Sequence, residues 1–445
     1  MKRVIISVIL FILGMISPGK AQEKTWSLQD CIDYALEQNI QVRKSKIAWE
    51  ESKENTLQSR AQLFPSLSFS SGQSLVNHPK TTDTDKNSYT GTYGFNSSVS
   101  LYRGGELRLN IRQQELQNKI QELYIQEAEN NIEIAITEGY LQVLYAAESV
   151  EINKKTVEIS EAQCERAREL YAAGDIAQSD LAQLLSQYSA DKYQLVVAQT
   201  ALDEKKLELK QLLELDISAV IELDIPEIQE NEVLQVLPSK EVIYAAALDF
   251  MPEIKNGRLA VSAAEYDVAI ARSGYLPSLD LTAGIGSSHL SGSGYSFSNQ
   301  MKNNFNESIG VTLSIPIYSN RKNKSALKIA RLKVEDADLD YLNTQKDLLK
   351  TVETVYLDAV SSQDRYRSAM ESVNAARQSF TLVQEQFNLG MKNTLEMLTE
   401  KNNLLIAQQE IVQAKYMAIL SQQLLGFYQG KGIQLGRRQN NTDNI

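Results

Sequence analysis

The chain has 445 residues, of which 43% are hydrophobic and 23% charged, and its formal net charge is -11. This apolar content excludes a disordered or collagen-like chain, two cysteines are too few for a disulfide scaffold, and the acidic balance argues against a nucleic-acid partner. The prolines leave two long gaps, one between Pro79 and Pro226 and one after Pro316. Because proline costs about 3 kcal/mol in a helix interior, these gaps predict two zones of very long helix.

The N-terminus has the pattern of a secretory signal peptide over residues 1–21. A basic start at Lys2 and Arg3 precedes an apolar run, and small residues end at Ala21, where we expect cleavage. The alternative is an N-terminal membrane anchor, but the apolar run is shorter than the ~18 residues that span a bilayer. Beyond it no apolar run is long enough for a transmembrane helix, so membrane insertion would have to be by strands.

The remaining sequence is a tandem repeat, with a first copy over 22–225, a second over 226–430, and a polar tail over 431–445. Residues 64–67 (Phe-Pro-Ser-Leu) match residues 276–279 (Leu-Pro-Ser-Leu) at an offset of 212, and Gly174 matches Gly390 at an offset of 216. The second copy therefore carries four extra residues, in the polar stretch 291–304. Each copy is predicted to fold as the same unit.

Within each copy we expect a helix that ends at Pro65 or Pro277, two strands joined by a polar loop, a very long helix, a turn and a returning helix. The strands are predicted at about 65–75, 90–103, 277–287 and 307–318, where apolar and polar residues alternate. This alternation is typical of a transmembrane barrel with a wet lumen, although an amphipathic sheet on a soluble core has the same period. Four aromatic residues near the strand ends would form an interfacial girdle: Phe64, Tyr102, Tyr275 and Tyr318.

Four strands cannot close a barrel, and an open edge is not viable in lipid. We therefore expect the chain to pool its strands with further copies of itself. The long helices are predicted from Glu106 to Leu170, about 98 Å at 1.5 Å per residue, and again from Asn323 to Gln386. Their spaced apolar residues resemble coiled-coil helices, and each should end in a turn, at Gly174 or Gly390.

No catalytic, cofactor or metal motif is predicted. His78 and His289 lie in expected loops without an acid or nucleophile at triad spacing, and Gly426–Gly432 lacks the spacing of a phosphate-binding loop. The run from Asp83 begins like a calcium loop but lacks its glycine and glutamate. Cys31 and Cys164 should lie about 30 Å apart along the helices, beyond the ~7 Å limit for a disulfide.

With these features the chain resembles the TolC-type outer-membrane efflux proteins. The resemblance rests on Ser27–Ile32 and Ala35–Asn39, on the two Pro-Ser-Leu junctions and on the duplicated glycine turns, and it covers essentially the whole mature chain. It implies a mainly helical homotrimer whose twelve pooled strands form a β-barrel in the outer membrane, continued by a periplasmic tunnel of helices. It also implies a periplasmic adaptor and an inner-membrane pump as partners.

The resemblance further assigns residues at the turns by position. Adaptor docking would fall on Gly174, Asp175, Ile176, Ser179, Gly390, Met391, Lys392 and Asn393. The aperture gate would consist of Ser179, Asp180, Phe387, Lys392 and Glu396. Two positions depart from the family pattern, because Phe387 has no hydroxyl to donate where a tyrosine can stand, and Thr399 replaces a possible second acid. A role of the two glycines as helix caps alone is the simpler alternative.

The sequence thus predicts a passive exit duct in the outer membrane of a Gram-negative type bacterium, without an enzymatic activity. Small-molecule efflux is favoured over the second possibility, the exit duct of a type I protein-secretion system. A non-conducting periplasmic or surface stalk is the alternative from a different class. At the gate, we expect Lys392 to contact Ser179 and Asp180, so that breaking these contacts loosens the tip.

Overall fold

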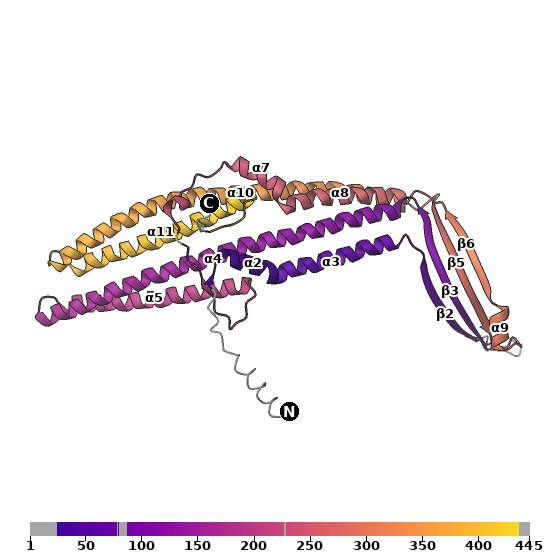
Figure 1. Ribbon diagram of the computed structural model, residues 1–445, viewed down its shortest axis with the longest axis horizontal. Helices are drawn as coiled ribbons and strands as arrows, with labels where there is room; N and C mark the ends of the chain where they lie inside the picture. The colour runs from indigo at the N-terminus through magenta and orange to yellow at the C-terminus, as the bar shows by residue number, and fades with distance from the viewer. Residues whose placement is uncertain (1–24, 78, 80–86, 227, 436–445) are drawn as a thin grey trace, which may run out of the picture. The chain divides into compact units, whose positions relative to one another are not determined.

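The computed structural model describes residues 25–77, 79, 87–226 and 228–435. The predicted signal peptide, the end of the C-terminal tail, His78 and the calcium-like run at Asp83 lie outside these residues. The described chain is mainly helical with one four-stranded sheet, which confirms the predicted fold class (Figure 1). Among the described residues no helix combines the length and the apolar character needed to cross a bilayer.

The chain forms two compact units, and each of them draws on both sequence repeats. The first unit consists of Met1–Arg43, Ala128–Met251 and Asp347–Ile445, and the second consists of Lys44–Glu127 and Pro252–Lys346. The two long helices, α4 (Glu106–Ala173) and α10 (Lys322–Asn388), contribute to both units. The sequence repeat is therefore not the compact unit of the fold.

The second unit holds an antiparallel sheet in the order β2-β3-β5-β6 (Figure 1). Its strands are β2 (Ser66–Asn77), β3 (Asn87–Arg103), β5 (Ser278–Leu290) and β6 (Asn306–Ser314). The two repeats meet where β3 pairs with β5, and β2 and β6 form the edges. β6 ends four residues before its predicted end because Pro316 has no N–H to donate to the ladder.

The cross-strand register places most apolar residues of the four strands on one face, with Val76 and Leu290 on the other. Phe69 of β2 lies opposite Phe95 of β3, which lies opposite Ile285 of β5, and the two Phe rings are 5.0 Å apart between centroids. We call this side the apolar face; it also contains Leu67, Val99, Leu279, Leu281, Ala283, Ile309, Val311 and Leu313. The opposite side, the polar face, carries Ser68, Ser70, Asn96, Ser98, Thr282 and Thr312.

Helices of the second unit are joined by polar contacts between their side chains. Arg60 of α3 (Ile40–Ala61) forms an ion pair of 2.7 Å with Glu115 of α4. Arg258 of α8 (Pro252–Ser273) donates a 2.8 Å hydrogen bond to Tyr341 of α10. Gly257 allows this approach, because a Cβ there would lie 2.6 Å from the Tyr341 ring.

The first unit contains the helices α2 (Leu28–Gln38), α5 (Gln178–Leu212), α6 (Glu230–Val233), α7 (Lys240–Phe250) and α11 (Thr394–Tyr428). The two-residue strands β1 (Thr25–Trp26) and β4 (Glu222–Leu223) pair in parallel beside the buried Tyr140. The hydroxyl of Tyr140 donates to the backbone carbonyl of Asp224 at 2.5 Å, and burial raises the pKa of this phenol.

The first helix of each repeat is broken, whereas the sequence predicted it as continuous up to Pro65 or Pro277. The breaks fall at Asn39 and Met251, which correspond at the repeat offset of 212. The Asn39 side chain accepts from the Gln41 N–H at 2.8 Å and caps the new helix, while Pro252 removes Met251 from helical geometry. Two different residue types therefore produce the same break.

Candidate functional site

The two predicted turns have the same backbone geometry. Gly174 and Gly390 follow α4 and α10 with φ of +87° and +73°. In each turn the N–H one residue past the glycine bonds to the carbonyl five residues back, Asp175 to Leu170 and Met391 to Gln386, both at 2.9 Å. This is the Schellman arrangement, in which glycine supplies the left-handed residue. Both glycines are exposed, and an added Cβ would meet no atom within 4 Å.

The helices that leave the two turns begin differently. Asn393 caps α11: its side chain accepts from the Glu396 N–H at 2.9 Å, and Glu396 accepts in return from the Asn393 N–H at 3.1 Å. α5 begins after Ala177, which offers no side-chain cap. Lys392 also donates to Glu396 at 2.6 Å, and its ammonium holds the pKa of this carboxyl below its ordinary range. The turn at Gly390 therefore has more side-chain hydrogen bonds at the start of its following helix than the turn at Gly174.

The structure joins the two turns by a contact other than the predicted one. Lys392 pairs with Glu396 of its own helix, and among the described residues it bonds to neither Ser179 nor Asp180. The hydroxyl of Thr394, which is only 4% exposed, donates to the half-buried Asp180 at 3.1 Å instead. Sequence reasoning missed Thr394 because a threonine at a helix start is usually part of a cap.

An apolar cluster packs the helices behind the turns. Cys164 of α4, Leu184 of α5, Phe380 of α10 and Met397 of α11 are all buried in it. The predicted gate residue Phe387 packs against this cluster with a partly buried ring, so its lack of a hydroxyl agrees with an apolar role. Both cysteines are free thiols, and burial raises the pKa of Cys164.

A buried polar triad lies beside this cluster and was not predicted. Lys401 of α11 donates to both Asp191 of α5 and Ser160 of α4, and the three residues are 2–4% exposed. Gln187 adds a 2.8 Å hydrogen bond to the other oxygen of Asp191. The sequence signal for this triad was a charged residue at a position where the helical spacing calls for an apolar one. Asp191 continues the spacing of Leu181, Leu184, Leu185 and Tyr188, and Lys401 continues that of Thr394, Met397 and Leu398.

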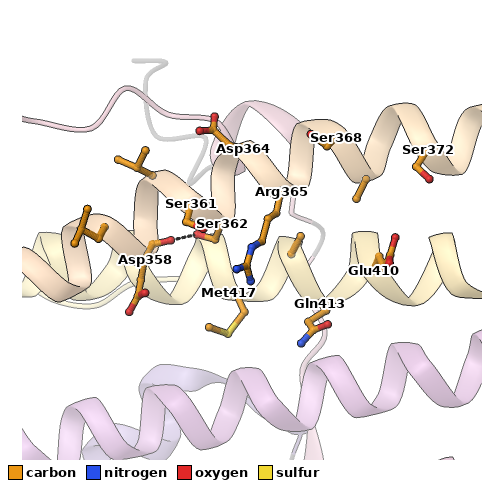
Figure 2. Close-up of a pocket in the computed structure, with 14 residues that line it drawn as sticks. Asp358, Ser361, Ser362, Asp364, Arg365, Ser368, Ser372, Glu410, Gln413 and Met417 are labelled. Atoms are coloured by element: carbon orange, nitrogen blue, oxygen red, sulfur yellow. Dashed lines mark hydrogen bonds between the residues drawn. The ribbon is translucent and has the colours of Figure 1, made fainter.

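A surface groove of about 950 Å³ runs along α10 and α11. Figure 2 shows Arg365 extending from α10 toward α11. Asp358 and Asp364 belong to α10 as well, and Glu410 belongs to α11. Three acidic residues and one arginine give this groove an acidic lining.

The four predicted girdle residues lie where the strands of the second unit meet its helices. Phe64 and Tyr275 occupy the turns before β2 and β5, and Tyr318 follows β6. A register shift between Ser100 and Tyr102 sets Tyr102 opposite Leu279, on the apolar face. All four rings are exposed. Among the described residues, no group of three or more His, Cys, Asp or Glu could hold a metal ion.

Comparison with known proteins agrees with this architecture. The profile of the family described as "Outer membrane efflux protein" matches residues 31–214 and 243–430. The alkaline protease secretion protein AprF of Pseudomonas aeruginosa is 25% identical over 91% of this chain and 84% of its own, and the outer membrane protein TolC of Escherichia coli is 22% identical over 86% and 78%. The solved structure of the outer membrane protein VceC of Vibrio cholerae has a TM-score of 0.75 at 18% identity, covering 92% of this chain and 97% of that one.

Proposed function

Because the chain belongs to the outer membrane efflux protein family, we propose that three copies assemble into one channel across the outer membrane. The observation that carries the proposal is the sheet, which has one apolar face, one polar face and open edges at β2 and β6. Lipid does not tolerate an open edge, so the edges must pair with other copies. Three copies give an even, twelve-stranded barrel with the apolar face toward lipid and the polar face toward water.

We propose that the channel is a passive exit duct fed from the periplasm by an adaptor and an inner-membrane pump. The adaptor would dock at the two turns, on the residues that the resemblance assigns. Two exposed apolar side chains beside Gly390 support this docking, since Leu389 is 75% and Met391 70% exposed. Leaving such side chains in water is unfavourable, and a protein partner would cover them.

We also propose that the turns form the gate. The Thr394–Asp180 bond joins the two hairpins directly, and its loss should loosen them by about 1.5–3 kcal/mol because the acceptor is charged. Thr394→Val should raise the single-channel conductance of the purified protein in a planar bilayer. Thr381→Val is the matched control, because the exposed Thr381 lies outside the assigned gate and its hydroxyl donates to the Arg377 carbonyl of its own helix. Lys392→Ala tests the predicted gate contacts of Lys392 in the same assay. A rise in conductance in this variant but not in Thr394→Val would assign the gate to Lys392 and not to Thr394.

The substrate class has two candidates. Small-molecule efflux is the first, and protein secretion is the second, favoured by the similarity to AprF and to the protease secretion protein PrtF of Dickeya chrysanthemi, at 25% and 22% identity. A strain lacking the gene separates them. Loss of small-molecule efflux appears as dye accumulation, and loss of protein secretion as an exoprotein missing from the medium. Complementation with the wild-type gene must restore whichever activity is lost.

The membrane assignment has its own test. Outer-membrane fractions run on gels without boiling should contain a compact trimer that shifts to the monomer position on heating. A non-conducting stalk would instead be recovered from the periplasmic extract, and this result would overturn the proposed channel.

A further inference from the structure

The four extra residues of the second repeat belong to a segment that folds back onto the sheet. Ser296 caps the short helix α9 (Phe297–Asn303) by accepting from the Asn299 N–H. α9 lies at the end of the sheet farthest from the junctions with the helices (Figure 1).

Hydrogen bonds hold α9 in a defined position on β5. Ser287 donates to the carbonyl of Met301 at 2.7 Å, and Asn304 donates to the carbonyl of Ser288 at 2.7 Å. The side chain of Gln300, 9% exposed, accepts from the Leu290 N–H at 2.7 Å and donates to the Tyr295 carbonyl at 2.9 Å. Buried polar groups with hydrogen-bond partners are typical of ordered, packed structure, so this segment is a folded part of the sheet's end.

α9 covers the end of the apolar face and not of the polar one. His289 and Ser287 lie on the same face of β5 as Ile285 and Ala283, because these four residues occupy every second position of the strand. The His289 ring lies 4.9 Å from Phe297 of α9, 5.9 Å from Tyr93 and 5.3 Å from Tyr89. Gly91, opposite His289, leaves room for this ring, since a Cβ there would lie 2.2 Å from it. We call Tyr89, Tyr93, His289 and Phe297 the distal aromatic cluster.

The cluster lies where the outer lipid boundary would be. On β6 the apolar face ends at Glu307, which pairs with Ile285. The cluster begins at Tyr93, which pairs with Ser287, the next residue of β5 on this face. Ten residues separate Leu279 from His289, or about 33 Å along the strand and about 25 Å at a tilt near 40°. This matches the ~25 Å apolar band of outer-membrane barrels, which ends in aromatic residues on both sides. The expected girdle of Phe64, Tyr102, Tyr275 and Tyr318 marks only the other side.

The outer surface of this region remains apolar. Tyr295, Phe297 and Phe305 are 66%, 55% and 54% exposed. Phe297 packs against His289 of the apolar face, and Phe305 precedes Glu307 by two residues. Aromatic rings of this kind are favoured at the level of lipid headgroups, where one part of the ring is in apolar surroundings and the other in water. Tyr89 has this character, because its hydroxyl donates to Gln73 at 2.6 Å.

We propose that α9 and the distal aromatic cluster form an interfacial anchor that contacts the lipid of the outer leaflet and sets the depth of the sheet in the membrane. The anchor rests on the proposed membrane barrel, because it takes the apolar face to be the lipid-facing one. The anchor would contact the lipid headgroup region, because it continues the face of the sheet that is proposed to meet lipid.

Fluorescence quenching tests the anchor in the full-length protein reconstituted into phosphatidylcholine vesicles. In a background with Trp26→Phe and Trp49→Phe, single tryptophans are introduced by Phe297→Trp or Tyr295→Trp. The lipids are brominated near either the carbonyl or the methyl end of the acyl chain. Ser74→Trp, on the polar face at the same height, is the lumen control, and Val311→Trp, on the apolar face opposite Leu281, is the lipid control.

The anchor predicts that carbonyl-end bromine quenches both new tryptophans at least about two-fold more than methyl-end bromine, and that Ser74→Trp responds to neither. Quenching at Val311→Trp without quenching at either Phe297→Trp or Tyr295→Trp would overturn the anchor and leave the barrel intact. If Val311→Trp is also unquenched, the proposed membrane barrel itself fails. If Phe297→Trp in α9 fails to fold, Tyr295→Trp in the preceding loop still tests the anchor, since both variants replace one exposed aromatic ring by another.

Discussion

Lys401 and Asp191 form an ion pair in which each side chain is only 4% exposed. The pair joins α11 to α5, and Ser160 connects it to α4, so three helices of the two hairpins share one buried charge network. Removing two charges from water is costly, and the pair is stable only while both partners and their hydrogen bonds are present. Loss of either charged partner should therefore remove the stabilisation that this contact gives to the two hairpins.

Truncating one partner of this pair should be strongly destabilising. Lys401→Met leaves the Asp191 charge buried without its cation, and we expect a loss of about 3–5 kcal/mol in the stability of the helical hairpins. Chemical unfolding followed by circular dichroism measures it. Lys192→Met, at an exposed neighbouring position, is the control. The double variant Lys401→Met with Asp191→Leu should recover part of the loss, and equal stabilities of the single and double variants would refute the pairing.

The two turn glycines should be required for their backbone conformation alone. Gly174→Ala and Gly390→Ala meet no atoms, so each should cost only the left-handed strain of about 1–2 kcal/mol. Faster hydrogen exchange in the last turn of α4 or α10 would show this loss, and Asn in place of Ala should restore part of the protection. Gly432→Ala, where an added Cβ also meets open space but φ is not positive, should change nothing. Equal effects at all three positions would contradict the argument.

The start of α11 should weaken as the pH falls. Lys392 lowers the pKa of Glu396 below its ordinary value of 4.5, so the folded state favours the ionised carboxyl. The stabilisation is fully present above the unfolded pKa and is lost as the pH falls through the lower, folded pKa. Hydrogen exchange in the first turn of α11, corrected for its intrinsic pH dependence, should rise in that range. Glu396→Gln should abolish the pH dependence, and its persistence would point to another group.

The two faces of β6 should tolerate charge very differently. Val311→Arg puts a cation on the apolar face, where the cost in a membrane barrel is about 2–4 kcal/mol near the midplane. Thr312→Arg puts the same cation on the polar face and should be nearly neutral. The fraction of protein that keeps its folded gel mobility in increasing denaturant compares the two variants. Equal sensitivity would show that the apolar face does not meet lipid.

The fold could be predicted from the sequence where a local rule was sufficient. Alternation in Leu279–Ile285 identified a strand and its faces, and the turn at Gly390 followed from its match with Gly174. The break at Asn39 was missed because asparagine in a polar helix resembles a surface residue until its cap is seen. The break at Met251 had a visible signal in Pro252.

The sites were harder to predict because they depend on distant partners. Asp191 and Lys401 each interrupt an apolar stripe, but their pairing depends on how three helices pack. Thr394 bonds across 214 positions of sequence, and α9 is held by contacts of Gln300 and Ser287 with the sheet. The Ser- and Gly-rich composition of its segment indicated only a loop.

The pairing of β3 with β5 also determines when the sheet can form. Thr90 lies opposite Leu290, 290 - 90 = 200 residues later in the chain. Contacts of such long sequence separation are slow, because the loop between them must be closed before any pairing is gained. The second edge of the β2–β3 hairpin, on β3, therefore has no partner until most of the second repeat has been synthesised and exported. Until then this edge must be shielded from self-association, so completion of the sheet is a late event that depends on the completed chain.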